Sequence, residues 1–462
     1  MLVASHRGPS SFTQAEDGSF SARRGAGGVV SALEPLLTRP DSAADGPATW
    51  VAAAMSEDDR AAVRAGAATV PDLDLHLLEL DPHTHRLHYD VVSNAVLWFL
   101  HHGLFDLPRR PRFDTRFREA WDAYTAVNRV FADHISECAP SDEIVLVQDY
   151  HLALVPGFLR AARPDLRVIH FNHTPFCGPN SIRVLPDPVA ASICESMASV
   201  PSGFHTARWA RAYEASAHEI LGADRSVTPA FVASLGPDAG DLAETAASPE
   251  AAAAAGVLEE QIGDRALIVR TDRIEPSKNI VRGFLAFDLL LSERPGWRER
   301  VVFVALVYAS REGLPEYLAY RQEVEQAAAR VNERWGRDDW QPVVLDTRDD
   351  HARSVAGLLR YDVLLVNPIK DGLNLVAKEG PLVNRRDGVV CLSREAGAFD
   401  ELRDGVVAVH PYDLVQTAAA LDTAISMPDD ERRDRAGRLR TLAAGRTPAD
   451  WLDDQLRAAR AG

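Results

Sequence analysis

Short apolar runs rich in β-branched residues alternate along this chain with longer amphipathic stretches. Buried parallel strands have continuous apolar sequences of this kind, because both faces of such a sheet are covered. The alternation of strand and helix predicts doubly wound α/β units. The predicted helices include 315–335 and 352–359, and the predicted strands are 143–148, 166–171, 266–270, 301–307, 343–345, 363–366 and 389–392.

The chain has 462 residues. At about 150 residues per domain, this length suits two or three domains. The segment 236–264 is unusually rich in Ala, Gly, Pro, Asp and Glu, so we place a junction at its start. We therefore expect one domain over 1–235 and a second over 236–462. In open α/β sheets, ligands bind at the carboxyl ends of the strands, so polar residues that follow strands are the candidate site residues.

The net charge of −17 is strongly acidic. It would repel nucleic acids and anionic membranes, so we expect neither as a partner. We find no apolar segment long enough to span a bilayer and no basic leader followed by an apolar core, so we expect a cytoplasmic protein. Cys138, Cys177, Cys194 and Cys391 form no C-x-x-C pair, and we interpret them as core residues rather than metal ligands.

Two cations follow the strand 266–270, namely Arg273 and Lys278. On a loop at the carboxyl end of a strand, they would suit a diphosphate, since arginine offers a fork of donors and lysine a point charge. The alternative is that both are ordinary surface cations.

A second candidate segment follows the strand 363–366. Asp371 lies in a turn, where it could accept hydrogen bonds from sugar hydroxyls, and Asn374 is a good N-cap for a helix. The first backbone N–H groups of that helix, at Leu375 and Val376, could bind phosphate. Glu379, one turn further on, could accept from ribose hydroxyls. The alternative is an ordinary capped helix.

The N-terminal half contains a comparable set. Arg7 follows the first strand, and the glycine-rich string 25–28 precedes a helix. Asp149 and His173 each lie just past a predicted strand of one sheet, which favours a functional role over a structural one.

Taken together, these strings resemble the trehalose-6-phosphate synthase family from residue 5 to about residue 456. The matching strings are Ser5-His6-Arg7, Gly25-Ala26-Gly27-Gly28, Ser93-Asn94-Ala95-Val96-Leu97-Trp98, Asp149-Tyr150-His151-Leu152, His173-Thr174-Pro175-Phe176, Arg273 with Ser277-Lys278, Ser310-Arg311, and Asp371 to Glu379. The resemblance implies a GT-B architecture, in which two Rossmann-like doubly wound domains face each other across a cleft. The N-terminal domain would bind the acceptor and the C-terminal domain the nucleotide sugar.

The resemblance also implies a role for each matching residue. Arg7, Tyr89, Trp98 and Arg311 would bind the acceptor phosphate, and Asp149 the acceptor sugar. The residues implied in catalysis are Arg273, Lys278, His173 and Asp371, of which the first two clamp the diphosphate and the last two contact the donor glucose. The donor-binding set comprises Gly27, Gly28, Leu373, Asn374, Leu375, Val376 and Glu379.

The implied reaction transfers glucose from a nucleotide-diphosphate glucose to glucose 6-phosphate with retention, giving α,α-trehalose 6-phosphate. We find no second carboxylate suited to act as a nucleophile. The family is thought to use same-face attack, in which the leaving diphosphate accepts the acceptor's proton. The protein then positions both sugars and stabilises the departing charge, so we expect no metal or other cofactor.

The segment 346–351 departs from relatives that use UDP-glucose, which have an apolar aromatic residue where Asp350 stands here. A carboxylate could accept hydrogen bonds from guanine N1–H and its 2-amino group, so the donor is GDP-glucose or UDP-glucose. The alternatives in function are a validoxylamine-phosphate-synthase-like pseudo-glycosyltransferase and a non-catalytic sugar-phosphate sensor. A homo-oligomer is possible. A nicotinamide dehydrogenase is not supported, because no G-x-G-x-x-G string occurs.

Overall fold

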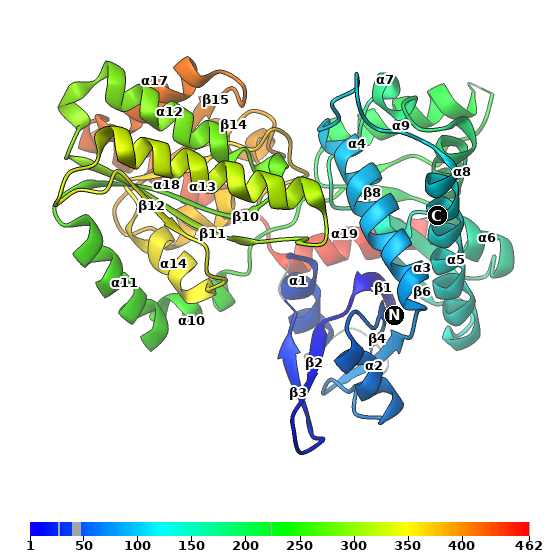
Figure 1. The fold of residues 1–462 in the computed structure, drawn as a ribbon. Coiled ribbons are helices and arrows are strands. Elements are labelled where there is room, and N and C mark those ends of the chain that lie inside the picture. Colours follow the sequence, from blue (N-terminus) through cyan, green and yellow to red (C-terminus); the bar gives the residue numbers. More distant parts are fainter. Residues whose placement is uncertain (26–27, 39–47, 223, 462) are drawn as a thin grey trace. The chain divides into compact units, whose positions relative to one another are not determined.

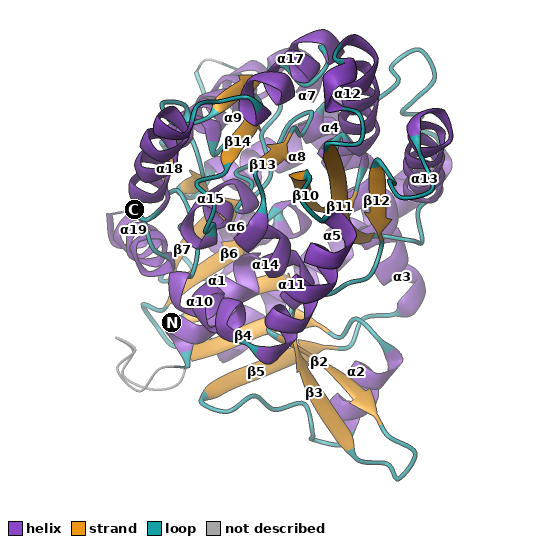
Figure 2. Cartoon of the chain, turned by 90° about the vertical axis from the view of Figure 1, so that its left-hand side faces the viewer, coloured by secondary structure: helices purple, strands orange, loops and turns teal. Residues whose placement is uncertain are grey.

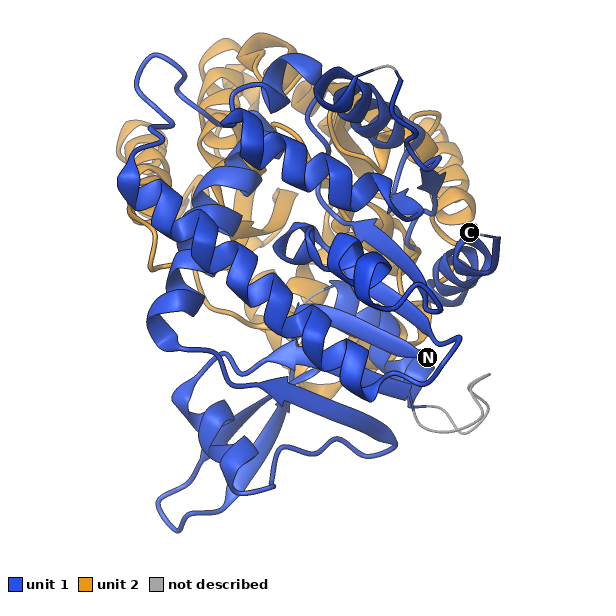
Figure 3. Cartoon of the chain, turned by 90° about the vertical axis from the view of Figure 1, so that its right-hand side faces the viewer, with its two compact units in different colours: residues 1–235, 448–462 blue, residues 236–447 orange. Residues whose placement is uncertain are grey.

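The computed structural model describes residues 1–25, 28–38, 48–222 and 224–461, which form two compact units. Unit 1 comprises Met1–Leu235 and Pro448–Gly462, and unit 2 comprises Gly236–Thr447 (Figure 3). The division after Leu235 lies at the junction that the sequence analysis placed there. The assignment of the C-terminal segment 448–462 to the second domain was wrong, since this segment packs within unit 1.

Within its described residues, unit 1 contains a seven-stranded parallel sheet in the order β5-β4-β1-β6-β7-β8-β9. Figure 1 labels strands β1, β4, β6 and β8 of this sheet. A short antiparallel hairpin, β2–β3, extends away from this sheet (Figure 2). The strands are β1 (Leu2–Arg7), β2 (Ser10–Gln14), β3 (Phe20–Arg24), β4 (Ala48–Ala53), β5 (Leu73–Leu78), β6 (Ile144–Gln148), β7 (Arg167–Asn172), β8 (Ser202–Phe204) and β9 (Phe231–Val232).

Helices pack on the sheet of unit 1 and bury two apolar clusters. The longest of them, α5, begins where the Asp114 carboxylate accepts the N–H groups of Arg116 and Phe117, and it buries Val127, Phe131 and Ile135 among the sheet residues. The helices are α1 (Gly28–Leu37), α2 (Glu57–Arg64), α3 (Pro82–Arg86), the π-helix η1 (Leu87–Leu97), α4 (Trp98–His102), α5 (Thr115–Cys138), the 3₁₀ helix η2 (Tyr150–Leu152), α6 (Val155–Ala162), α7 (Pro179–Ile182), α8 (Asp187–Ala198), α9 (Ala207–Leu221) and α19 (Pro448–Ala461).

Unit 2, all of whose residues are described, contains a six-stranded parallel sheet in the order β12-β11-β10-β13-β14-β15. This is the 3-2-1-4-5-6 order of a Rossmann fold. The strands are β10 (Ala266–Ile274), β11 (Val301–Ala309), β12 (Val343–Asp346), β13 (Val363–Val366), β14 (Val389–Ser393) and β15 (Val407–Val409). The helices are α10 (Ala239–Ala247), α11 (Pro249–Ile262), η3 (Pro276–Lys278), α12 (Ile280–Glu293), η4 (Pro295–Trp297), α13 (Pro315–Trp335), α14 (His351–Arg360), α15 (Val376–Val383), α16 (Phe399–Leu402), α17 (Leu414–Ile425) and α18 (Asp429–Ala443).

The structure corrects two local predictions in unit 2. Strand β10 continues past residue 270, because it pairs with β11 as far as Ile274 and Ala309, so Arg273 lies on the strand rather than on the loop after it. Asn374 is not a helix N-cap, since α15 begins two residues later. Its backbone has a φ of 77°, a left-handed conformation that asparagine tolerates better than most residues. Among the helices of the described ranges, none is both long and apolar enough to cross a membrane.

The C-terminal helix α19 packs on the sheet of unit 1 through a buried tryptophan. The Trp451 ring meets the Phe171 ring of β7 edge-on, with centroids 5.3 Å apart. One turn further along α19, the Gln455 side-chain oxygen accepts a hydrogen bond of 3.0 Å from Gln148 at the end of β6. Gln148 ends β6 and pairs with Phe171, the last residue but one of β7. Helix α19 therefore supports the carboxyl ends of these strands, where ligands bind in folds of this kind.

We expect Trp451→Ala to destabilise the protein by about 3–5 kcal/mol, because it leaves a cavity in a packed core. Thermal or urea unfolding measures the change. Asp453→Ala, an exposed position on the same helix, is the control and should shift stability by no more than about 0.5 kcal/mol. Equal effects of the two substitutions would contradict the packing argument.

Candidate active site

In unit 1, Arg7 ends β1 and its guanidinium donates a 2.9 Å hydrogen bond to the Tyr89 hydroxyl. Tyr89 comes from η1 and is held by ring stacking, since the His6 ring lies parallel to it with centroids 4.7 Å apart. His6 also stacks on His151 at 5.1 Å. Burial, with the neighbouring histidines and Arg7, holds the pKa of His6 well below its usual value, so the His6 ring is neutral. The structure therefore brings together two of the predicted acceptor residues, Arg7 and Tyr89.

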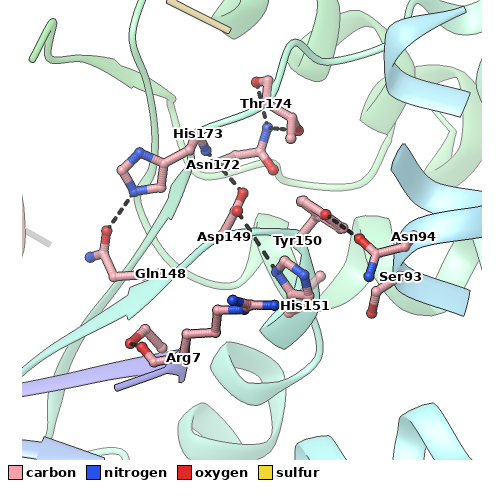
Figure 4. A network of polar contacts seen from close by, with 12 residues as sticks. Arg7, Ser93, Asn94, Gln148, Asp149, Tyr150, His151, Asn172, His173 and Thr174 are labelled. Carbon is pink, nitrogen blue, oxygen red and sulfur yellow. Dashed lines mark hydrogen bonds and ion pairs between the residues drawn. The ribbon is translucent and has the colours of Figure 1, made fainter. Parts of the chain in front are cut away.

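Asp149 follows β6 with a φ of 71°, a strained conformation for a residue other than glycine. This backbone turns its carboxylate toward β7, where one oxygen accepts the His173 backbone N–H at 3.2 Å. The other carboxylate oxygen lies 3.7 Å from His151 Nδ1 (Figure 4). Asp149 thus connects His173 to the stack beside Arg7.

Both ring nitrogens of His173 have partners within the protein. Nε2 lies 2.9 Å from the Gln148 side-chain oxygen, and Nδ1 lies 3.2 Å from His205 Nε2 (Figure 4 shows the first contact). Gln148 uses its amide nitrogen on Gln455, so its oxygen accepts from His173 Nε2–H. Burial lowers the pKa of His173 well below its usual value, and the neighbouring His205 and His170 add to the shift. A neutral His173 suits a hydrogen-bonding role near a sugar and does not suit a general acid.

Trp98 begins α4 and is nearly buried, with its ring stacked on His102 at 3.8 Å and 6.1 Å from the ring of Tyr150. The Tyr150 hydroxyl in turn donates to the Asn94 side chain at 2.9 Å, which ties η1 to the residue after Asp149 (Figure 4). Of the glycine string, Gly28 opens α1 and is exposed, and Gly27 lies outside the described residues.

In unit 2, the completely buried Arg270 organises the end of β10. Its guanidinium donates to the Asp272 carboxylate at 2.7 Å, to the Lys278 backbone oxygen at 2.8 Å and to the Asn367 side-chain oxygen at 3.2 Å. Asn367 directly follows β13, the neighbouring strand. Arg270 therefore fixes the backbone of Lys278 beside the ends of two strands.

The Lys278 ammonium lies 2.6 Å from Asp371 and 3.8 Å from Asp272. Burial alone would lower the pKa of Lys278, but Asp371 and Asp272 outweigh it and raise the pKa. Asp371 also accepts a 3.2 Å hydrogen bond from the Asn374 side chain. The structure thus brings together Lys278, Asp371 and Asn374, three of the predicted site residues.

A second carboxylate holds the two predicted arginines together. Glu275 is fully buried, and one of its oxygens lies 3.2 Å from the Arg273 guanidinium and 3.3 Å from that of Arg311. Ser310 donates to the same oxygen at 3.0 Å. Burial alone would raise the pKa of Glu275, but Arg273 and Arg311 lower it, so the group is an anion. Arg311 has a φ of 49° and also donates to the Tyr317 hydroxyl at 2.6 Å.

The ion pairs around Lys278 and those around Glu275 together carry a net positive charge, although the protein as a whole is acidic. The cations are Arg270, Arg273, Lys278 and Arg311, and the carboxylates are Asp272, Glu275 and Asp371. Four cations against three carboxylates leave a charge of +1 at the carboxyl end of β10, whereas the whole chain carries −17. This local reversal of sign favours an anionic ligand.

The helix α15 begins at Val376 with Leu375 at its N-cap position, and Leu373 is buried just before it. Glu379 lies in the first turn of α15, and burial raises its pKa to about 7, with a further contribution from Asp241. The Asp350 side chain is the N-cap of α14, where it accepts the Arg353 backbone N–H at 3.0 Å.

The solved structures that resemble this chain share its fold over nearly their whole length. A trehalose-6-phosphate structure from E. coli bound with UDP-2-fluoro glucose has a TM-score of 0.85 at 26% identity and covers 99% of this chain and 98% of its own. A trehalose-phosphate synthase (UDP-forming) of Burkholderia xenovorans in complex with glucose-6-phosphate has a TM-score of 0.84 at 25% identity and covers 99% of each chain. The two Rossmann-like units and the similarity to these solved structures show that the chain has the GT-B glycosyltransferase fold.

The profile of Glycosyltransferase family 20 matches residues 1–461. The trehalose-6-phosphate synthase of Mycobacterium bovis is 31% identical over 98% of this chain and 93% of its own length. The chain belongs to glycosyltransferase family 20, the trehalose-6-phosphate synthases. It spans about half the length of several other curated relatives, such as a probable α,α-trehalose-phosphate synthase (UDP-forming) of Arabidopsis thaliana, which is 29% identical over 94% of this chain and 54% of its own length.

Sequence reasoning missed several residues that support this site. Arg270 was named only as the last residue of the predicted strand 266–270 and was given no role in the site. Glu275, within the string 271–279, was given no role either. A charged residue within a buried strand is a signal that could have found Arg270, because such a charge requires partners. Gln148 and His151 directly flank Asp149 and its neighbour Tyr150, but only the structure shows that they contact His173 and Asp149.

We expect Glu275→Gln to lower stability by about 1–3 kcal/mol, because it leaves Arg273 and the nearly buried Arg311 close together without their shared carboxylate. Thermal unfolding at pH 7 measures this change. The control is Glu312→Gln, which removes an exposed ion pair with Arg321 and should cost less than about 1 kcal/mol. A Glu275→Gln protein as stable as the control would show that the arginines do not need this anion.

Proposed function

We propose that this protein transfers glucose from a nucleotide-diphosphate glucose to glucose 6-phosphate with retention, giving α,α-trehalose 6-phosphate. The observation that carries the proposal is the group at the end of β10, where Glu275 holds Arg273 and Arg311 and where Asp371 holds Lys278. The relatives named trehalose-phosphate synthases, and those solved with UDP-2-fluoro glucose and with glucose-6-phosphate, support the choice of substrates.

In unit 2, the donor diphosphate would bind Arg273, Lys278 and the backbone N–H groups at the start of α15. Arginine and lysine donate strong hydrogen bonds to phosphate oxygens, and a helix N-terminus adds a favourable dipole. These groups are fixed before the reaction by their carboxylate partners, so they can stabilise the departing diphosphate with little rearrangement.

In unit 1, Arg7 and Tyr89 would bind the acceptor phosphate and Asp149 a hydroxyl of the acceptor sugar. We assign Trp98 to the same acceptor group, and Arg311 of unit 2 to the acceptor phosphate. His173, Asp371 and the glycine string would contact the donor glucose and its phosphates. Since both ring nitrogens of His173 are engaged, its backbone oxygen or a rearranged ring would have to make its sugar contact.

Retention would follow from attack on the same face from which the diphosphate leaves. A double displacement needs a carboxylate nucleophile about 5–5.5 Å from an acid. Asp371, the carboxylate that would contact the donor glucose, is instead paired with Lys278. The neutral His173 does not supply a proton. The departing diphosphate would therefore accept the acceptor's proton, and the reaction would need no metal. Four free thiols suit a reducing compartment such as the cytoplasm.

The donor base separates two versions of this proposal. The acidic loop before α14 favours guanine, because a carboxylate oxygen of Asp350 could accept from the guanine edge. The relatives named UDP-forming favour uracil. As the N-cap of α14, Asp350 already uses one oxygen on Arg353, which leaves the other to meet a base.

The first experiment measures product from glucose 6-phosphate with GDP-glucose and UDP-glucose in parallel, with and without a chelator. Trehalose 6-phosphate with an α,α linkage by NMR is the expected product. A preference for GDP-glucose that Asp350→Asn lowers would support the guanine version, and a strong preference for UDP-glucose would sink it. No product with either donor would overturn the proposed function.

We expect Arg273→Ala and Lys278→Ala each to lower turnover by about 10²-fold, as does the loss of a single charge-stabilising donor in other enzymes. Steady-state kinetics with the better donor measures the effect. Arg321→Ala, which removes a half-buried cation of unit 2 that is paired with Glu312, is the control and should leave turnover unchanged. Losses below about threefold for both site variants would contradict the clamp.

We expect the affinity for the nucleoside diphosphate to rise between pH 6 and pH 8 through ionisation of Glu379. Its pKa of about 7 keeps much of this side chain neutral at pH 6, and a carboxylate accepts hydroxyl hydrogen bonds more strongly than a neutral acid. Calorimetric titration at each pH gives the ratio of the affinities of wild type and Glu379→Gln for the nucleoside diphosphate. The ligand's own protonation affects both affinities equally and therefore cancels in this ratio. A ratio that does not change with pH would refute this role.

The same group should affect the stability of the ligand-free protein with the opposite sense. Its pKa in the folded state, about 7, exceeds the ordinary 4.5, so the folded state binds more protons between these values. Stability should therefore fall, relative to Glu379→Gln, as pH rises through this window.

A further inference from the structure

Three potential metal ligands meet at one edge of the unit 1 sheet. His76 lies on β5, the edge strand, while His134 and Cys138 lie one turn apart at the end of α5. One ligand atom from each of the three lies within 4.8 Å of the others, and all three side chains are half-buried. Among the described residues, this is the one group of three or more His, Cys, Asp or Glu side chains whose ligand atoms lie this close together.

A carboxylate orients one of these histidines. His76 Nε2 lies 3.1 Å from Asp74, which also accepts a hydrogen bond of 3.3 Å from the Thr49 hydroxyl. A proton on Nε2, donated to Asp74, leaves His76 Nδ1 with its lone pair directed toward His134 Nε2, 2.7 Å away. Histidines that bind metals commonly donate their other ring N–H to a carboxylate in this manner.

We propose that His76 Nδ1, His134 Nε2 and Cys138 Sγ bind one zinc ion, with water as the fourth ligand. Two imidazoles and one thiolate form a donor set that suits zinc over magnesium or calcium, which prefer oxygen. Nearby Asp74 and Glu137 add negative charge around the site. Burial raises the pKa of the Cys138 thiol, and bound zinc would reverse this by stabilising the thiolate.

The geometry requires only small side-chain movements. With zinc–nitrogen bonds of about 2.0–2.1 Å, two tetrahedral nitrogen ligands lie about 3.3 Å apart, so His76 and His134 would separate by less than about 1 Å. In the structure, their nitrogens share one hydrogen bond. Zinc binding would move the His134 proton from Nε2 to Nδ1, release the proton of the Cys138 thiol, and replace the hydrogen bond with two metal bonds.

Such an ion would join the edge strand β5 to the last turn of α5. It would be structural and would take no part in the proposed transfer of glucose. Because the ion binds the folded state, it would stabilise the protein by an amount that grows with the logarithm of the zinc concentration. The interpretation of Cys138 as a core residue missed this site, since His76 is far away in sequence and only the His134–Cys138 spacing is local.

The test titrates metal-free protein with Zn²⁺ and with Co²⁺. We expect one ion per chain, a thiolate-to-cobalt charge-transfer absorption and a rise in Tm with zinc. Cys138→Ser should abolish the absorption, and His134→Gln should remove stoichiometric binding. Asp74→Asn, which keeps all three ligands, should weaken zinc affinity about 10- to 100-fold.

His83→Gln is the matched control. His83 is an exposed histidine of α3 that lies 3.4 Å from Glu119 on α5, the helix that carries His134 and Cys138. This substitution should leave zinc affinity unchanged. The absence of stoichiometric binding by the wild type would overturn the proposal, whatever the variants do. So would zinc affinity in Cys138→Ser and His134→Gln equal to that of the control.

Discussion

The buried guanidinium of Arg270 is the constraint on which the candidate site of unit 2 depends. A buried charge costs several kcal/mol unless it is fully paired, so Asp272, Asn367 and the Lys278 backbone must lie where Arg270 can reach them. The same constraint reaches helix α12. A Cβ atom at Gly283 would lie 2.8 Å from the guanidinium, so a side chain there would displace the group that fixes Lys278.

The two units prepare their ligand-binding ends by different physical means. Unit 2 uses paired charges, in which each carboxylate fixes one or two cations that face the strand ends. Unit 1 uses neutral rings, since burial keeps His6, His88 and His173 uncharged, and the stacking of His6 orients Tyr89 and His151. A neutral surface rich in directed hydrogen bonds suits sugar hydroxyls, and a surface with excess positive charge suits phosphates.

The sequence predicted the α/β class and seven strands of the two sheets, because buried parallel strands have a strong local pattern. The junction at residue 236 was predicted from the change in composition that begins there. The end of β10 was misplaced because Arg270 and Asp272 interrupt the apolar pattern, although the two side chains pair with each other and Arg270 also donates to Asn367, which follows β13. The position of α19 could not be predicted, since the Trp451–Phe171 contact joins residues 280 positions apart. Where sequence reasoning named the residues of the site, it did not predict which carboxylate pairs with which cation.

That pairing has a consequence for the proposed reaction. In the structure, Lys278 is neutralised mainly by Asp371, at 2.6 Å, while Asp272 lies further away at 3.8 Å and is held by Arg270. A diphosphate that attracts the Lys278 ammonium would weaken its bond to Asp371 and leave that carboxylate able to accept a sugar hydroxyl. Asp272 would remain to keep Lys278 charged. Phosphate binding and sugar binding would then be coupled through one ion pair within unit 2, so that a donor with both parts would bind better than the sum of its pieces.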